Sequence, residues 1–344
     1  MKVLVTGANG YLGFPLTQVL MERGFEVTGL DTNFYRSGWL YNGFLELPSV
    51  VTKDIRQVTE TDLTGYDAVI HLAELSNDPL GQIDPQITME INHHGTVNLA
   101  QKAKQAGISR FIYYSSCSIY GASDEIATED SKPNPLTAYA KCKVLNEHAL
   151  KKEANSHFTP VILRNATAFG SSPRMRFDLV INNLTALAYL TQEITMESDG
   201  TPWRPFVHVL DICEAVICAL KAPRNTIHSE IFNVGATSGN YQIRDIANII
   251  SAVIPKCRIT FNPKGADKRN YRVNFDKISS QLPGFSAKRD VLSGVKELVD
   301  LFQKINFTKK EFSAKEFTRL KQINYLLNSG KIDSHLQWIG KASL

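Results

Sequence analysis

The stretch Thr6-Gly7-Ala8-Asn9-Gly10-Tyr11-Leu12-Gly13 decides the fold of this chain. It follows an apolar run at residues 2–6 and precedes an amphipathic pattern at residues 12–23, so it joins a strand to a helix. Its glycines, spaced G-x-x-G-x-x-G, permit a tight turn, the close approach of a pyrophosphate to the backbone, and close packing of helix on strand. The spacing differs from the commoner G-x-G-x-x-G. At this point, a glycine turn with a structural role and no ligand therefore remains an alternative.

Outward from this turn, short apolar runs alternate with longer amphipathic ones. Strands that are apolar on both faces, with helices between them, predict a parallel, doubly wound α/β sheet of the Rossmann type. Ligands are then expected at the carboxyl ends of the strands. The expected strands are residues 2–6, 26–31, 50–52, 68–72, 111–115 and 161–164, and the expected helices include residues 12–23, 96–107 and 137–155.

The pattern changes after Gly170, where no clear βαβ unit appears. We expect a dinucleotide-binding domain at residues 1–170, completed by about residues 206–235. Residues 171–205 and 236–344 would form a smaller, mixed α/β substrate-binding lobe. The elements expected after residue 170 are strands at 206–209 and 231–234 and helices at 179–190, 212–220 and 315–327.

Composition narrows the class of protein. The 344 residues are 43% hydrophobic and 21% charged, which is ordinary for a globular chain with a sizeable core. The net charge of +4 is modest and the basic residues are scattered, so nucleic acid is not indicated. Five cysteines without a C-x-x-C pair argue against a disulfide framework and a zinc site. The first strand begins at Lys2 and no apolar run approaches about 18 residues, so we expect a cytoplasmic protein without a membrane partner.

Asp31 ends the second expected strand. A carboxylate there can accept hydrogen bonds from the ribose hydroxyls of adenosine and would repel a 2′-phosphate. Strand, glycine turn, helix, strand and acid in this order favour that role over turn capping, and they predict NAD as the cofactor. Arg36 is nearby in the sequence and could accommodate a 2′-phosphate, so NADP remains an alternative cofactor. The other expected cofactor contacts are Gly7, Asn9, Gly10, Tyr11, Leu12 and Gly13 in the turn, and Asp54, Ile55, Leu72 and Ala73 after later strands.

Tyr139 and Lys143 lie four residues apart on an expected helix, so their side chains share one face. A nearby ammonium group stabilises tyrosinate and lowers the pKa of a phenol from about 10. The phenol could then remove or return a hydroxyl proton while a hydride moves. A lone Y-x-x-x-K pair is a surface accident more often than a site, but Ser116 comes after the fifth strand and ends at the same sheet edge. A serine there can hydrogen-bond the reacting oxygen, although turn capping is the alternative.

Together these motifs resemble the extended short-chain dehydrogenase/reductases, over at least residues 1–280. More narrowly, the chain is similar to the nucleotide-sugar epimerase/dehydratase branch of that family. The resemblance implies Ser116 as the catalytic serine, Tyr139 as the acid/base, and Lys143 as its activator and a ligand of the nicotinamide ribose. It also implies a nucleotide-diphosphate sugar as substrate and a homodimer joined through the helices at residues 96–107 and 137–155. The motifs are T-G-x-x-G-x-x-G, the acid after the second strand, H-L-A at 71–73, S-S-x-x-x-Y-G at 115–121 and Y-x-x-x-K at 139–143.

Further residues match family positions. Asn92 matches the family's asparagine in the helix after the fourth strand, and would contact the cofactor. Arg204 lies in a stretch similar to D-G-x-x-x-R-D-F-V-H-V, in which the arginine meets the sugar-nucleotide diphosphate, although Pro205 replaces the usual aspartate. The planar guanidinium fork suits phosphate oxygens. The other residues expected to contact substrate are Cys117, Ser118, Asn165, Asn183 (or its neighbour Asn182) and Arg269.

The two residues after Ser116 narrow the choice of reaction. The 4,6-dehydratases of this branch carry an acid just after the catalytic serine or threonine, whereas Cys117 and Ser118 stand here. Cys117 is either an acid/base beside a ketone or, with better odds, an inert core thiol. Epimerisation through a transient keto sugar is therefore the reaction that we expect. Net oxidation, ketoreduction or dehydration remain alternatives, and a non-catalytic NAD-binding regulator is the hypothesis from another class.

Overall fold

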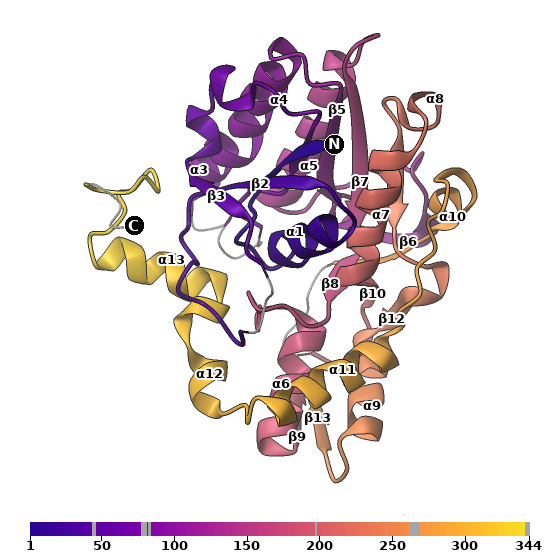
Figure 1. The fold of residues 1–344 in the computed structure, drawn as a ribbon. Coiled ribbons are helices and arrows are strands. Elements are labelled where there is room, and N and C mark those ends of the chain that lie inside the picture. Colours follow the sequence, from indigo (N-terminus) through magenta and orange to yellow (C-terminus); the bar gives the residue numbers. More distant parts are fainter. Residues whose placement is uncertain (43–45, 77–80, 82–83, 197, 262–268, 341–344) are drawn as a thin grey trace.

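The computed structural model describes residues 1–42, 46–76, 81, 84–196, 198–261 and 269–340 (Figure 1). Seven parallel strands form the main sheet in the order β3-β2-β1-β4-β5-β7-β11, which confirms the predicted doubly wound α/β fold. The order reverses between β1 and β4, and ligands bind at such a switch point. The strands are β1 (Lys2–Thr6), β2 (Glu26–Asp31), β3 (Ser49–Thr52), β4 (Ala68–His71), β5 (Arg110–Ser116), β7 (Thr159–Asn165) and β11 (Ile231–Val234).

Helices cover both faces of this sheet because its central strands are apolar on both sides. In β1, Val3 and Val5 join one buried cluster with α1, α7 and α10, while Leu4 joins the opposite cluster with α3, α4 and α5. The parallel register brings Asp31 opposite Thr52 and Ser116 opposite Asn165, so their side chains begin at one edge. The helices of the two layers, with α8 beside β7, are α1 (Gly13–Glu22), α3 (Pro85–Met89), α4 (Gly95–Gln105), α5 (Ala138–Glu153), α7 (Val209–Lys221), α8 (Arg224–Ile227) and α10 (Asp276–Gln281).

A second lobe lies below this layer in Figure 1, around its own buried cluster. Its helices α6 (Val180–Thr191), α9 (Ile243–Val253) and α11 (Val291–Lys304) pack on one another. In the described chain, three small sheets lie outside the main sheet. These are β12 (Asn240–Gln242) with β10 (Trp203–His208) and β8 (Thr167–Phe169), β9 (Glu193–Met196) with β13 (Arg258–Phe261), and β6 (Ala122–Ala127) with β14 (Asn270–Val273).

The predicted strand at residues 206–209 is present in β10, but it lies outside the seven-stranded sheet. β10 pairs with β8 and β12, and β11 alone of the later described strands joins the main sheet. Helix α7 nevertheless packs against α1, and β11 pairs with β7, so both elements pack with the main sheet. The domain boundaries at residues 170, 205 and 235 stay predictions.

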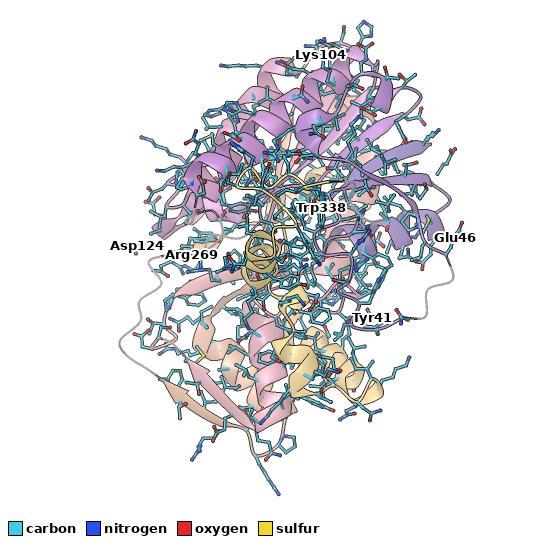
Figure 2. The ribbon with its side chains drawn as sticks, turned by 90° about the vertical axis from the view of Figure 1, so that its left-hand side faces the viewer. Tyr41, Glu46, Lys104, Asp124, Arg269 and Trp338 are labelled. Atoms are coloured by element: carbon cyan, nitrogen blue, oxygen red, sulfur yellow. The ribbon has the colours of Figure 1, made fainter. Side chains whose placement is uncertain are left out.

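The predicted helix at residues 315–327 is interrupted. A 3₁₀ turn, Lys315–Phe317, ends at the extended Thr318, and α13 (Arg319–Asn328) begins after it. Together with α12 (Lys309–Ser313), these elements belong to a C-terminal segment, residues 309–340, which returns to the loops after β2 and β3. Figure 2 shows this segment in yellow across the middle of the molecule, with Trp338 labelled on it. None of the helices in the described ranges is long and apolar enough to cross a membrane.

Candidate active site

A cavity of about 450 Å³ lies at the carboxyl edge of the main sheet and extends to the second lobe. This volume suits a small-molecule site. Most of the residues that the sequence motifs indicate lie on its wall: Gly7, Gly10, Tyr11, Leu12, Gly13, Asp31, Asp54, Ile55, Leu72, Ala73, Ser116, Ser118, Tyr139, Lys143, Asn165, Arg204 and Arg269. We call it the main cavity.

The glycine positions of the turn have no space for a side chain. Gly7 has a φ of +73°, and a Cβ on Gly13 would lie 2.0 Å from the carbonyl oxygen of Gly7. Helix α1 begins at Gly13 without a hydrogen bond from a capping side chain. Its first backbone N–H groups and its positive dipole end therefore suit an anion such as a pyrophosphate.

Asp31 is buried at the end of β2. Its carboxylate accepts hydrogen bonds from the backbone nitrogens of Asn9 (3.0 Å) and Asn33 (2.7 Å). Burial raises the pKa of Asp31, and these two hydrogen bonds oppose that effect. Asn9 thus positions Asp31 through its backbone and is not itself on the cavity wall.

Asp54 lines the main cavity, but its carboxylate already has partners. The guanidinium of Arg56 donates to it at 2.6 Å, and the amide of Gln337, from the C-terminal segment, donates at 3.1 Å. Ile55 supplies apolar surface beside it. The C-terminal segment therefore contacts the region where an adenine is expected.

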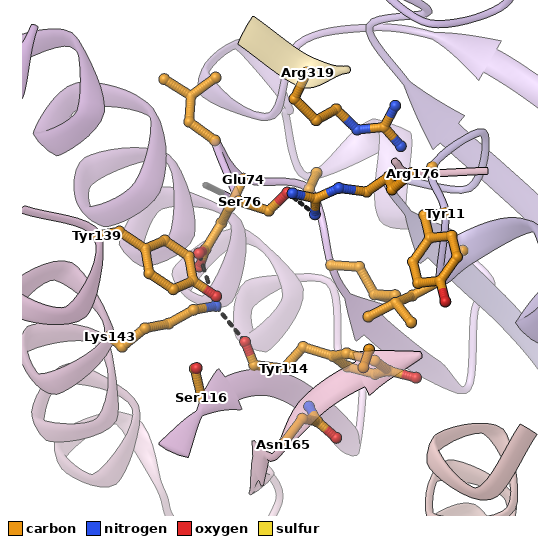
Figure 3. A pocket seen from close by; sticks show the side chains of 18 of the residues that line it. Tyr11, Glu74, Ser76, Tyr114, Ser116, Tyr139, Lys143, Asn165, Arg176 and Arg319 are labelled. Atoms are coloured by element: carbon orange, nitrogen blue, oxygen red, sulfur yellow. Dashed lines mark hydrogen bonds and ion pairs between the residues drawn. The ribbon is translucent and has the colours of Figure 1, made fainter. Parts of the chain in front are cut away.

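Helix α5 carries Tyr139 and Lys143 to the other end of the cavity (Figure 3). Thr137 caps this helix by accepting a hydrogen bond from the backbone nitrogen of Ala140 at 3.1 Å. The Lys143 ammonium donates to the carbonyl oxygen of Tyr114 and lies 5.3 Å from the centre of the Tyr139 ring. Figure 3 shows both side chains pointing into the cavity, near Ser116.

Glu74 is a site residue that no sequence motif indicated. Its carboxylate forms an ion pair with the Lys143 ammonium at 2.7 Å and accepts a hydrogen bond from the Tyr113 hydroxyl at 2.7 Å. Its side chain is only 2% exposed, and burial raises its pKa. The sequence did offer one signal for Glu74 as a site residue, because it directly follows the H-L-A motif at the end of β4.

The serines at the end of β5 differ in their contacts. The Ser116 oxygen accepts a hydrogen bond from the Ser118 backbone nitrogen at 3.1 Å, so Ser116 does cap the following turn, yet it also lines the cavity. Within the described chain, the buried Ser118 hydroxyl and the side-chain oxygen of Asn165 have no hydrogen-bond partner. A buried polar atom without a partner is costly, so both suit contact with a polar ligand.

Arg204 and Arg269 also line the cavity. Arg204 lies on β10, donates to the carbonyl oxygen of Trp203 at 2.7 Å, and has its guanidinium 5.4 Å from the centre of the Tyr271 ring. Arg269 directly precedes β14. Two cations, one on β10 and one just before β14, thus lie on the wall of the cavity.

Three further predicted residues do not line the cavity. Asn92 is buried in a π-helical turn, Glu90–His94, where its side chain bonds the backbone of Leu75 at 2.8 and 3.1 Å and so fixes the chain after Glu74. The buried Cys117 thiol donates to the carbonyl oxygen of Arg164, and burial raises its pKa well above the ordinary value. Asn183 donates to the carbonyl oxygen of Phe177 at 2.7 Å. Each of these side chains is thus engaged with the protein backbone.

Arg176 and Arg319 also line the main cavity, and no sequence motif indicated either of them. Arg176 comes after β8 by a few residues, and Arg319 begins α13 near the other end of the chain. No spacing motif links two arginines so far apart in sequence. Only the folded chain brings them to one wall (Figure 3).

Comparison with known proteins identifies the family. The model of the NAD dependent epimerase/dehydratase family matches residues 3–235, more than half of the chain. The chain belongs to this family. It is therefore an NAD-dependent enzyme of the epimerase/dehydratase kind, and the cofactor predicted from Asp31 is confirmed. The uncapped glycine turn, the buried Asp31 and the Tyr139–Lys143 pair fit NAD, and these residues would hold it.

Relatives within this family carry different activities. A UDP-glucose 4-epimerase of Lactobacillus helveticus is 27% identical over 278 residues, which cover 74% of this chain and 82% of that protein. UDP-glucuronic acid decarboxylase 2 of Arabidopsis thaliana is 27% identical and covers 93% of this chain and 73% of that protein. The solved UDP-glucuronic acid 4-epimerase of Bacillus cereus, in complex with UDP-glucuronic acid and NAD, is 26% identical with a TM-score of 0.75, covering 89% of this chain and 100% of that one.

Proposed function

We propose that this enzyme is a nucleotide-sugar epimerase that works through a transient keto sugar. The observation that carries the proposal is the grouping of Tyr139, Lys143 and Ser116 on one wall of the main cavity, with Arg204 and Arg269 also lining the cavity. The first group suits proton transfer at a sugar hydroxyl. The second suits the diphosphate of a nucleotide sugar. The names of the relatives above support that substrate class.

Bound NAD would supply the redox chemistry, a hydride acceptor and then donor for the sugar carbon. The chain's own residues manage the proton and the charge. The Tyr139 side chain, as tyrosinate, takes the proton of the sugar hydroxyl and becomes a phenol. It gives that proton back in the return step, so it ends as the tyrosinate with which it began. Lys143 holds positive charge beside the Tyr139 oxygen, and the Ser116 hydroxyl donates a hydrogen bond to the reacting sugar oxygen. For epimerisation, the sugar must turn its other face to the same residues before the return step.

Asn165 and Ser118 are proposed to contact the sugar or its diphosphate, because each presents a buried oxygen without a protein partner in the described structure. A nucleotide sugar supplies hydroxyl donors for such oxygens. A substrate that lacked these hydroxyl groups would leave both oxygens unsatisfied, at a cost of about 1–3 kcal/mol each. These two residues would therefore contribute to the choice of substrate.

Dehydration is the second candidate, and one observation favours it. Positions 117 and 118 hold no acid, but Glu74 brings a buried carboxyl group to the same cavity, with a pKa raised by burial. A protonated carboxyl group could donate a proton to a leaving hydroxyl group. Epimerisation remains our proposal because Glu74 is engaged by Lys143 and Tyr113.

The products of a panel of nucleotide sugars distinguish these reactions. UDP-glucose, UDP-galactose and UDP-glucuronic acid would be incubated with the enzyme and NAD, and the products read by mass spectrometry and NMR. We expect a new sugar stereoisomer of unchanged mass and no net accumulation of NADH. Loss of water, loss of carbon dioxide or stoichiometric NADH would each contradict epimerisation, and no conversion of any sugar would favour a non-catalytic regulator.

Tyr139→Phe is the matched inactive variant for this assay. It removes the hydroxyl group that carries the proton but keeps the ring, so the helix and the fold should be unaffected. We expect turnover to fall about 10²- to 10⁴-fold, since general acid–base catalysis contributes about that much. NAD affinity by calorimetry and the thermal unfolding midpoint should stay near the wild-type values. A variant that kept more than about a tenth of the activity would exclude Tyr139 as the acid/base.

A further inference from the structure

Arg319, the first residue of α13, is a buried cation without an anionic partner in the described part of the chain. Its residue is 5% exposed, and it lines the main cavity. Among the described residues it makes no ion pair or hydrogen bond, and it lies instead over the face of Tyr35, whose ring centre is 4.0 Å from the guanidinium carbon. A buried charge is costly unless it is paired. Its surroundings therefore indicate a missing anion.

A second buried arginine stands near Arg319. Arg176 donates to the carboxylate of Asp178 at 2.9 and 3.0 Å and to the Ser76 hydroxyl at 3.1 Å. Asp178 is therefore hydrogen-bonded to Arg176, whereas it acts on Arg319 only through its charge, as Asp31 does. Burial, and then repulsion from Arg176, lower the pKa of Arg319 to about 10. The guanidinium group still carries its charge at neutral pH, so an anion placed here would interact with a full positive charge.

The Asp31 carboxylate, in the cofactor region, does not fill this role. It is occupied by the backbone nitrogens of Asn9 and Asn33. Arg174, also in this region, donates instead to the carbonyl oxygens of Tyr35 and Arg36. In the described part of this region, the three guanidinium groups of Arg174, Arg176 and Arg319 accompany two carboxylates, those of Asp31 and Asp178, which leaves one positive charge in excess. The uncapped N-terminus of α1 lines the same cavity.

Arg319 is held firmly in place by the rest of the C-terminal segment. Gln322 donates to the carbonyl oxygen of Phe34 at 2.8 Å, and the Trp338 indole donates to the carbonyl oxygen of Thr32 at 2.7 Å. Ile323 and Leu326 are buried in the cluster that covers one face of the main sheet. The segment is thus anchored to the loop after Asp31, and this anchoring fixes the backbone from which the Arg319 side chain extends.

We propose that Arg319, with Arg176 beside it, binds the diphosphate of NAD, so that the C-terminal segment forms part of the cofactor site. The diphosphate would lie between the N-terminus of α1 and the two guanidinium groups. A nucleotide sugar also carries a diphosphate, but Arg319 lies over Tyr35 in the loop after β2, on the adenosine side of the cavity. Arg204 and Arg269 serve the substrate side. This inference deepens the proposed function by naming residues that hold its cofactor.

Arg319→Met tests this assignment in the full-length protein freed of bound nucleotide. Met keeps an unbranched, flexible side chain and removes the charge. Lys321→Met is the matched control, because it removes the same charge from the exposed face of the same helix. Calorimetry would measure the affinity for three probes: NAD, adenosine (which lacks phosphate) and UDP (which carries only the substrate's diphosphate). Arg319→Lys, which keeps the charge without the planar fork, is a second variant.

We expect Arg319→Met to weaken NAD at least about tenfold, since a hydrogen bond to a charged group contributes about 1.5–3 kcal/mol. Adenosine and UDP affinities should stay within about twofold of wild type, Arg319→Lys should be intermediate, and Lys321→Met should bind NAD normally. The nucleotide-free variant should unfold at an equal or higher temperature than wild type, because an unpaired buried charge has gone. Unchanged NAD affinity would overturn the site, and a loss confined to UDP would assign it to the substrate. Neither outcome depends on epimerisation.

Discussion

At the scale of single residues, Lys143 is shared between Glu74 and Tyr139. Its ammonium group lies 2.7 Å from the Glu74 carboxylate and 5.3 Å from the Tyr139 ring centre. Negative charge on Glu74 offsets the field that would otherwise stabilise a tyrosinate. The acid at position 74 therefore restrains the acidity of the residue that we propose as the acid/base.

Glu74→Gln should release this restraint. The amide is similar in size and uncharged, so the positive charge of Lys143 would act on Tyr139 alone. We expect the acidic limb of the pH profile of kcat/KM to move to lower pH, by about one pH unit for the loss of one close charge. Glu153→Gln is the control, because it removes a carboxylate from α5 that pairs with Lys104 instead. An acidic limb that stayed in place, or moved to higher pH, would contradict this account.

The same substitution has a signature in stability, apart from catalysis. Burial raises the pKa of Glu74 in the folded protein, so the folded state keeps a proton that the unfolded chain has already lost. The free energy of unfolding of the wild type should therefore fall as the pH rises from the ordinary glutamate pKa to the raised one. Glu74→Gln should show no such fall in chemical denaturation at a series of pH values.

At the scale of elements, β10 connects the substrate side to the main sheet. It pairs in parallel with β8, which directly follows β7, and antiparallel with β12. Arg204 stands opposite Tyr241 in that pairing, and Pro205, which has no N–H to donate, stands opposite Asn240. The strand thus holds Arg204 at the cavity with little freedom to move.

Arg204→Ala should weaken nucleotide-sugar binding and spare the cofactor. We expect the dissociation constant for a UDP-sugar to rise at least about tenfold, because a charged contact to phosphate contributes about 1.5–3 kcal/mol. NAD affinity should stay near wild type in the same calorimetric titrations. Arg272→Ala is the matched control: Arg272 lies on the adjacent β14, outside the main cavity, against Trp203. Equal UDP-sugar affinity in wild type and Arg204→Ala would remove Arg204 from the site.

At the scale of the whole molecule, the predicted homodimer would use α4 and α5. These helices pack on each other, and Lys104 of α4 pairs with Glu153 of α5 at 2.9 Å. Leu145 on α5 is 40% exposed, which is high for a leucine in the middle of a long helix. An apolar side chain there suits contact with a second copy of the chain.

Leu145→Arg should therefore give a monomer, because two charges would be desolvated across a two-fold interface. Sedimentation velocity at micromolar concentration measures this directly. Leu292→Arg is the control, since Leu292 is equally exposed but lies on α11 in the second lobe. A monomeric wild type would refute the dimer, and a dimeric Leu145→Arg would place its interface elsewhere.

The main sheet could be predicted because its signals are local. Each strand is a short apolar run, and the glycine turn and Asp31 mark the first unit. Contacts between residues that are distant in the sequence could not be predicted from such local patterns. The pattern of β10 is the same whether it joins β11 or β8, and nothing near residue 319 in the sequence refers to Tyr35. Glu74 lies directly after the H-L-A motif, but its pairing with Lys143 depends on how deeply α5 packs.

The anchoring of the C-terminal segment also has a consequence for synthesis on the ribosome. Phe34 and Gln322, which hydrogen-bond in the folded protein, are 288 residues apart. At about 5–20 residues per second, roughly 15–60 seconds separate their appearance. The nascent chain can pair its first strands in that interval, but the loop after β2 waits for its last partner until α13 has left the ribosome. A chain released early would keep its Rossmann strands and lack the segment that brings Arg319 to the cavity wall.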